Sequence, residues 1–172
     1  MKKYSNRLVV VHWMTLLLFM AALYLGYSVS QARQAGNATL AAYQAHLLLG
    51  DVVLVLTLLR IFFKRKDGAP AATGNTWLDK FAKAVHHALY AILVLLPVSG
   101  MATVATSAIA KALSAGDAKL LPSDFASVPM HDVHMGLMLA LVALVAVHVL
   151  GAIKHQIIDK DDLMDRMSFR RK

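Results

Sequence analysis

Apolar residues are gathered in four long runs, separated by shorter segments that hold most of the charged and turn-forming residues. The runs extend from about Leu8 to Val29, from about Ala41 to Phe63, from about Val85 to Ala108 and from about Val133 to Ile158. A helix needs about 20 apolar residues to cross a bilayer, where it satisfies its own backbone hydrogen bonds. The pattern therefore predicts an all-α fold, an integral membrane four-helix bundle that forms a single domain over residues 1–172.

Composition agrees with a membrane protein. Of the 172 residues, 58% are hydrophobic and 16% are charged, whereas soluble domains have about 45–50% and about 25%. The basic residues before the first run also suit a cleaved signal peptide. However, this run is longer than a signal core of about 7–15 residues, and it contains His12. We therefore expect a retained span, with membrane lipid as the surrounding partner.

Positive charge alternates between the connecting segments. Cations are concentrated before the first run, between the second and third runs, and after the fourth, while the other two loops have few. The concentrated cations are Lys2, Lys3, Arg7, Lys64, Arg65, Lys66, Lys80, Lys83, Lys160, Arg166, Arg170, Arg171 and Lys172. The positive-inside rule then predicts that both termini and the middle loop are cytoplasmic. This orientation explains the net charge of +8, so we expect no nucleic-acid partner.

Four of the eight histidines can be paired by depth in the membrane. His134 and His148 are 14 residues apart on one predicted helix, so they share a face and lie about 21 Å apart along its axis. His12 lies early in the first span, on the cytoplasmic side, and His46 lies early in the second, on the outer side. Depth therefore matches His12 with His148 and His46 with His134.

Paired intramembrane imidazoles favour haem binding. Imidazole is a good iron ligand, and two histidines close both axial positions, which suits electron transfer rather than oxygen binding. The chain contains no cysteine, which excludes iron–sulfur clusters, thiolate ligation and covalent c-type attachment. The sequence thus predicts two non-covalent haems b. Metal or proton transport and polar packing between helices remain open as alternatives.

Other polar residues lie at the ends of the spans. Histidine is poised to supply protons near neutral pH, so three of these residues form a candidate quinone site on the cytoplasmic side, with exposure at the interface as the alternative. They are His86, His87 and His155. Arg7 and Arg60, with Lys64 nearby, are candidates for pairing with haem propionates, or for reaching lipid headgroups. His131 is expected to be solvated in an outer loop.

The remaining segments are expected to be irregular. The segments Asp67–Thr76 and Leu113–Pro129 are rich in turn-forming residues and predict loops. The chain after Ile158 alternates acids with Met and Leu and predicts a polar tail, with an amphipathic segment on the membrane surface as the alternative. Pro97 and Gly100 interrupt the third span, where a proline kink would also leave room for a flat macrocycle.

Several segments, taken in order, resemble the bacterial cytochrome b561 family, the small four-helix cytochromes of the inner membrane. They are YSNRLVVVHW, HLLLGDVVLVLTLLR, HHALYAILVLLPVSG, HMGLMLALVALVAVHVLGAIKH and KDDLMDRM, and they cover nearly the whole chain. The resemblance implies two haems b held at the positions of His12, His46, His134 and His148. It also implies a multi-pass inner-membrane location, a ubiquinone or other quinone site near the cytoplasmic haem, and a homodimer.

The resemblance favours an electron-transfer protein or oxidoreductase that passes electrons across the membrane to or from quinone. One relative oxidises superoxide, an anion that a positive outer surface would attract. Here the outer cations and acids are balanced, so quinone-linked electron transfer is preferred over a superoxide:quinone oxidoreductase. These residues are Arg33, Lys111 and Lys119 against Asp117, Asp124 and Asp132. The alternatives are a cytochrome b subunit of a larger dehydrogenase or hydrogenase, and a non-redox transporter that uses intramembrane histidine.

Overall fold

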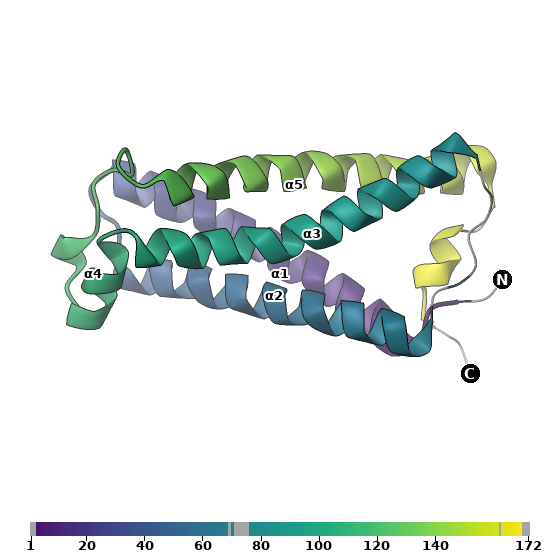
Figure 1. The fold of residues 1–172 in the computed structure, drawn as a ribbon, viewed down its shortest axis with the longest axis horizontal. Helices are drawn as coiled ribbons and strands as arrows, with labels where there is room; N and C mark the ends of the chain where they lie inside the picture. Colours follow the sequence, from purple (N-terminus) through teal and green to yellow (C-terminus); the bar gives the residue numbers. More distant parts are fainter. Residues whose placement is uncertain (1–2, 69, 71–75, 162, 170–172) are drawn as a thin grey trace.

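The computed structural model describes residues 3–68, 70, 76–161 and 163–169. Four long helices run alternately up and down in a bundle (Figure 1). They are α1 (Asn6–Gln34), α2 (Leu40–Asp67), α3 (Trp77–Ala105) and α5 (Pro129–Lys154), which continues into the π-helical turn η2 (His155–Asp159). All four are long and apolar enough to cross a membrane. No strand occurs among the described residues, and the predicted all-α four-span bundle is confirmed.

The two ends of the bundle differ. Both chain termini lie at one end, here called the terminal end, as an even number of spans requires (Figure 1). The opposite end, here called the α4 end, is covered by the short helix α4 (Ile109–Ala115) and by the 3-10 turn η1 (Ala118–Leu120). The prediction of a loop over 113–129 is therefore wrong in its first part. Ile109 and Ala112 are buried, and this apolar contact folds the segment onto the bundle.

The C-terminal segment is also more ordered than the expected polar tail. It forms the 3-10 turn η3 (Leu163–Met167), which packs against the start of the chain. The Tyr4 backbone N–H donates to the Arg166 carbonyl at 3.1 Å, and the Trp13 indole donates to the Met167 carbonyl at 3.2 Å. Met164 and Met167 supply apolar surface that a purely polar tail would lack.

Part of the predicted sequence lies outside the described residues. This applies to most of the expected 67–76 loop and to the cations Lys2, Arg170, Arg171 and Lys172. At the edge of that loop, Thr76 begins α3 with a capping box. Its hydroxyl accepts from the Asp79 N–H, and the Asp79 carboxylate accepts from the Thr76 N–H at 2.8 Å.

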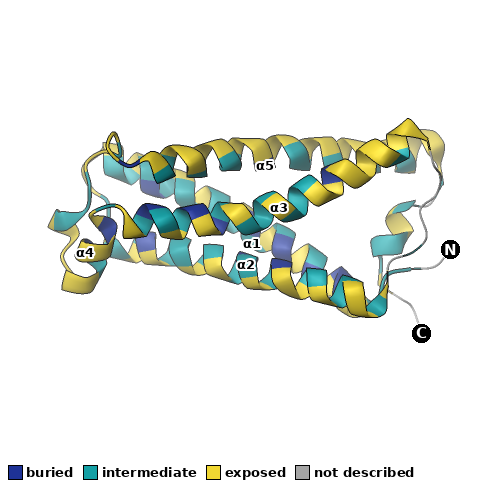
Figure 2. Ribbon diagram, viewed as in Figure 1, coloured by how far each residue is buried: buried dark blue, intermediate teal, exposed yellow. Residues whose placement is uncertain are grey.

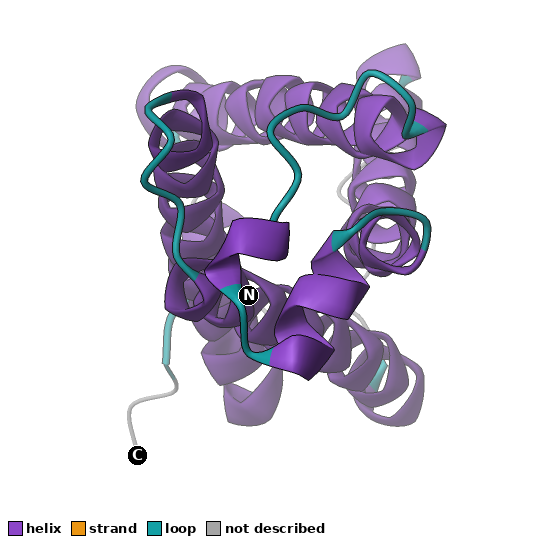
Figure 3. Ribbon diagram, turned by 90° about the vertical axis from the view of Figure 1, so that its left-hand side faces the viewer, coloured by secondary structure: helices purple, strands orange, loops and turns teal. Residues whose placement is uncertain are grey.

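The helices pack as two antiparallel hairpins. Helix α1 lies along α2, and α3 lies along α5, while α2 and α3 join the hairpins; α1 and α5 barely touch. Viewed along the bundle, the four helices are arranged around a common axis (Figure 3). Helix α3 changes direction along its length (Figure 1). It contains the buried Pro97, which lacks the N–H that would bond to the Leu93 carbonyl, a common cause of helix bending. Buried residues face inward and exposed apolar residues face outward, as lipid requires (Figure 2).

Inward-facing residues recur every seven positions on the long helices. The central level consists of the buried residues Phe19, Val53 and Leu141, with Leu93 packed against them. On α5, His134 lies seven residues before Leu141, and His148 lies seven residues after it. A seven-residue repeat is typical of helices that pack at about 20° with a left-handed twist. The repeat produces stacked levels of side chains inside the bundle, with polar levels on both sides of an apolar centre.

Candidate functional site

The level toward the α4 end holds the first histidine pair. His46 of α2 and His134 of α5 face each other, with ring centroids 6.3 Å apart and ring planes at 89°. The Nδ1 atom of each ring lies 3.0 Å from a main-chain carbonyl oxygen of a neighbouring helix, Ala22 of α1 for His46 and Leu96 of α3 for His134. When Nδ1–H donates to this carbonyl, the tautomer is fixed and Nε2 is left with a free lone pair.

A glycine on the neighbouring helix allows each imidazole ring to come this close to the main chain. Gly26 and Gly100 lie four residues after the accepting carbonyls of Ala22 and Leu96. A Cβ atom on Gly26 would lie 2.9 Å from Cε1 of His46, and one on Gly100 would lie 3.1 Å from Cε1 of His134. Any side chain at these positions would therefore press on the imidazole that its helix supports.

The second pair lies at the level toward the terminal end. His12 of α1 and His148 of α5 have ring centroids 6.5 Å apart and ring planes at 81°. Because α5 is continuous between His134 and His148, the 14-residue separation places the two pairs about 21 Å apart. The apolar level of Phe19, Val53 and Leu141 lies between them.

Both pairs fit six-coordinate iron. Metal–imidazole bonds are about 2.0–2.1 Å long, and a ring centroid lies about 1.1 Å behind the nitrogen, so two axial imidazoles on one iron have centroids about 6.3 Å apart. The observed separations are 6.3 and 6.5 Å. Helices α1 and α5 make few close backbone contacts with each other. In addition, a Cβ on Gly50, one turn from His46, would meet nothing within 4 Å.

A cavity adjoins the second pair. Besides His12 and His148 it is lined by residues of α1, α2, α3 and the C-terminal segment, namely Tyr4, Leu8, Arg60, Lys64, His86, Tyr90 and Met167. The His86 ring lies 5.1 Å from that of His148. The cationic groups of Arg60 and Lys64 lie 5.3 and 5.1 Å from the Tyr90 ring centroid. The cavity thus combines the imidazoles of His12 and His148 with two cations that can pair with carboxylates and with side chains that can donate protons.

Two of the residues singled out in the sequence do not line this cavity. The Arg7 guanidinium forms an ion pair with Asp67 and lies 4.9 Å over the Phe63 ring. Nδ1 of His87 lies 2.7 Å from the Lys83 carbonyl oxygen, within its own helix, and its side chain is exposed. Of the adjacent histidines on α3, it is His86 that faces the cavity.

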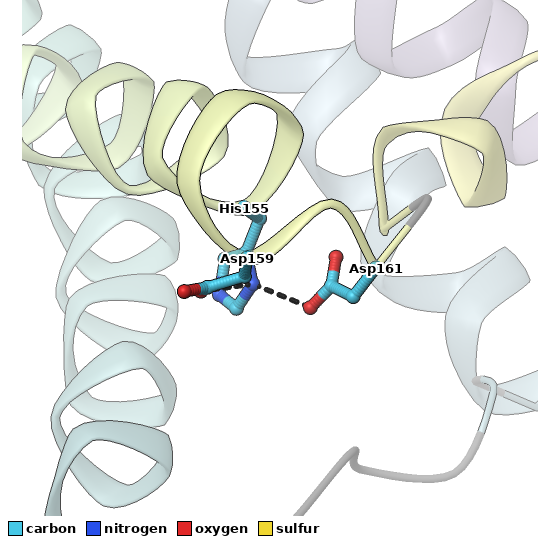
Figure 4. A group of neighbouring side chains, drawn as sticks. All are labelled: His155, Asp159 and Asp161. Atoms are coloured by element: carbon cyan, nitrogen blue, oxygen red, sulfur yellow. Dashed lines mark hydrogen bonds and ion pairs between the residues drawn. The ribbon is translucent and has the colours of Figure 1, made fainter.

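His155 forms a separate group at the end of α5. Its Nδ1 atom lies 2.7 Å from a carboxylate oxygen of Asp161 and 3.3 Å from one of Asp159 (Figure 4). Lys154 bonds the same Asp159 carboxylate at 2.5 and 2.8 Å. The π-helical turn and the left-handed Lys160 bring these side chains together. His86, His87 and His155 therefore have three different sets of partners.

His131 differs from the expectation that it is solvated. Its ring stacks on Phe125 with centroids 4.2 Å apart and planes at 12°, and 27% of its side chain is exposed. Sequence reasoning also gave no role to Arg33, Tyr43 or Tyr90. The seven-residue spacing indicates that Arg33 lies on the inward side of α1, because it continues the series His12, Phe19 and Gly26.

Comparison with known proteins identifies the family of the chain. Residues 3–170 match the model of the prokaryotic cytochrome b561 family. The chain is 27% identical to cytochrome b561 homolog 1 of Escherichia coli strain K12, over 100% of both chains. It is 29% identical to cytochrome b562 of Cereibacter sphaeroides, over 95% of this chain and 94% of the relative. No solved structure matches. The chain therefore belongs to the prokaryotic cytochrome b561 family, whose members are haem b electron-transfer proteins that cross the bacterial inner membrane several times.

Proposed function

We propose that this cytochrome holds two haems b, one between His12 and His148 and one between His46 and His134, and that it carries electrons across the membrane to or from a quinone. The observation that carries the proposal is the presence of two histidine pairs with iron-compatible separations, 6.5 and 6.3 Å, at two depths in one bundle. Bound haem supplies one-electron transfer at each depth.

The surrounding residues prepare both pairs for ligation. The carbonyls of Ala22 and Leu96 orient His46 and His134 and raise their basicity through Nδ1. At the other pair, Arg60 and Lys64 line the cavity and are suited to bind propionates. Arg7, which is paired with Asp67, is not part of this proposal.

The quinone site is proposed in the cavity at the terminal end, on the cytoplasmic side according to the charge pattern. Quinone reduction consumes protons as well as electrons, so the site needs proton donors near the iron ligands. His86 and Tyr90 line the cavity, and His86 lies 5.1 Å from His148. Neither His87 nor His155 lines it, so the candidate site narrows from three histidines to His86.

Reoxidation kinetics test the quinone assignment. The reduced protein is mixed with a short-chain ubiquinone, and the decay of the reduced haem α-band is followed by stopped flow. We expect His86→Asn to keep both haem spectra and to slow reoxidation at least tenfold. His87→Asn, which alters the adjacent exposed histidine, should behave as wild type. Equal rates in all three proteins would remove the quinone site from this cavity.

The α4 end does not support superoxide as the electron donor. Its described cations, Arg33, Lys111 and Lys119, are equal in number to its acids, Asp117, Asp124 and Asp132. Such a surface has no excess positive field to attract a small anion. The proposal is therefore limited to quinone-linked electron transfer.

The membrane-facing side of α2 suggests a second copy of the chain as a partner. Asp51 is exposed on this side, 11 residues from Leu40 and 9 from Arg60, which places it close to the middle of the span. Gln44, seven residues earlier, is exposed on the same stripe. An acidic side chain facing lipid at this depth costs at least about 2.5–3.5 kcal/mol. A neighbouring helix would relieve that cost.

We propose a homodimer in which one exposed stripe of α2 packs against the same stripe of the second copy. The stripe consists of Gln44, Leu48, Asp51 and Val55. Two copies inserted in the same direction place identical residues at the same depth, so Asp51 meets its own counterpart and both side chains are shielded from lipid. The Gln44 amides can form a second contact, because an amide both donates and accepts. Leu48 and Val55, 64% and 54% exposed, provide apolar contact around the polar positions.

A further inference from the structure

The α4 end contains a buried hydroxyl without a partner. Tyr43 is 5% exposed, and its Oη atom is the one buried side-chain polar atom in the described part of the chain that lacks a hydrogen bond. Burying a hydroxyl without a hydrogen bond costs roughly 1–3 kcal/mol by mutational measures. A buried donor of this kind therefore calls for a ligand that accepts from it.

The position of Tyr43 relates it to the histidine pair at this end. It precedes His46 by three residues on α2, so it lies on nearly the same face and about 4.5 Å closer to the α4 end. Arg33 has a corresponding place on α1. It follows Gly26, which contacts the His46 ring, by seven residues, so it shares the inward stripe and lies about 10.5 Å closer to the α4 end.

Contacts with the α4 end hold the Arg33 guanidinium in place. Its Nη1 donates to the Ser123 carbonyl at 2.6 Å, and its Cζ atom lies 5.2 Å from the Phe125 ring centroid. Phe125 in turn packs in the same apolar cluster as Tyr43. The cation and the orphan hydroxyl therefore belong to one small region beneath the cap formed by α4 and η1.

This region is suited to bind carboxylate. An arginine has five N–H donors, of which one is used on Ser123, and its fork matches the two oxygens of a carboxylate. The Tyr43 hydroxyl adds a donor at a second position. The nearest acid along α5, Asp132, is turned to solvent, with 86% of its side chain exposed, so it does not occupy the donors.

We propose that Arg33 and Tyr43 bind the propionate carboxylates of the haem held by His46 and His134. This assignment rests on the proposed two-haem function and adds the residues that anchor and tune the second haem. Arg60 and Lys64 serve the other haem at the opposite end, so each haem directs its carboxylates toward its own membrane surface. Phe125 and Ser123 act as positioning residues for Arg33.

Redox titration of the purified holoprotein tests the assignment. Removing a cation or a donor leaves the propionates more negative, which stabilises ferric haem and lowers the reduction potential. We expect Arg33→Gln to lower the reduction equilibrium constant of the haem at the α4 end about tenfold, which is about 59 mV for one electron. Tyr43→Phe, which keeps the ring, should lower it about threefold. The other haem should not shift in either variant.

Two matched variants separate direct contact from general effects. Lys111→Gln removes an exposed cation from the same end, and Tyr27→Phe removes a hydroxyl from the exposed side of α1; both should leave the potential unchanged. The proposal is overturned if Tyr43→Phe and Arg33→Gln keep the wild-type potential, or if Lys111→Gln shifts it equally. A wild-type protein that binds a single haem would instead refute the two-haem function itself.

Discussion

Replacing Gly26 by alanine tests the packing of the His46 pair most sharply. The added Cβ would lie 2.9 Å from Cε1 of His46, whereas ordinary contacts begin at about 3.4 Å, so the ring must move by about 0.5 Å. The ring is held by the 3.0 Å hydrogen bond from Nδ1 to the Ala22 carbonyl and would also be held by iron. The displacement therefore acts on both bonds.

The expected cost follows from these contacts. Overpacking costs about 1–3 kcal/mol, and a weakened hydrogen bond adds about 0.5–1.5 kcal/mol. Alanine has a better helix propensity than glycine, which offsets up to about 1 kcal/mol of this cost. The net loss is therefore about 0.5–4.5 kcal/mol, and its midpoint of about 2.5 kcal/mol corresponds to roughly seventyfold weaker affinity for the haem at this pair. Gly100→Ala, with its 3.1 Å contact to His134, should show a smaller loss.

Haem transfer to apomyoglobin measures this affinity for each haem in detergent. Gly26→Ala should release one of the two haems faster, while the haem between His12 and His148 is retained as in wild type. Gly151→Ala is the control, because its Cβ would meet nothing within 4 Å. If Gly26→Ala retained both low-spin haems with wild-type affinity, the glycine would not be supporting an iron ligand.

Three further predictions concern the spectra, the assembly and the orientation. Imidazole planes at 81° and 89° keep the iron dπ orbitals nearly degenerate, so both ferric haems should give highly anisotropic low-spin electron paramagnetic resonance signals; rhombic spectra would contradict the ligand geometry. Asp51→Leu should convert the dimer to monomer in analytical ultracentrifugation without loss of haem, whereas an unchanged mass, or a wild-type monomer that binds another membrane protein, would argue against the α2 homodimer. Reporter fusions should place Gly36 and Gly116 outside, and the C-terminus inside together with Gly74, which is outside the described residues; an external C-terminus would refute the charge-based topology.

Much of the fold and of the histidine pairing could be predicted because both depend on helix periodicity. Four apolar runs define four spans, and the 14-residue interval between His134 and His148 fixes two depths on one helix. Depth alone predicts His12 as the partner of His148 and His46 as the partner of His134. In the structure the ring centroids of these pairs lie 6.5 and 6.3 Å apart.

Features that depend on contacts between distant segments were not predicted. The direction in which His86 and His87 point is set by how α3 packs on α5, and a pair of adjacent histidines does not contain that information. Arg7 lies away from the cavity because it pairs with Asp67, 60 residues further along the chain, a contact that local sequence does not indicate. The ordered C-terminal turn likewise depends on hydrogen bonds to Tyr4 and Trp13 at the other end of the chain.

The central claim is that two haems b are held by two depth-matched histidine pairs. The haem-to-polypeptide ratio, measured by pyridine haemochrome on the purified protein and on two single variants, tests it most directly. The account predicts a ratio of two for wild type and of one for both His148→Ala and His134→Ala, with the remaining haem low-spin. A wild-type ratio of one, or two six-coordinate haems in either variant, would contradict it.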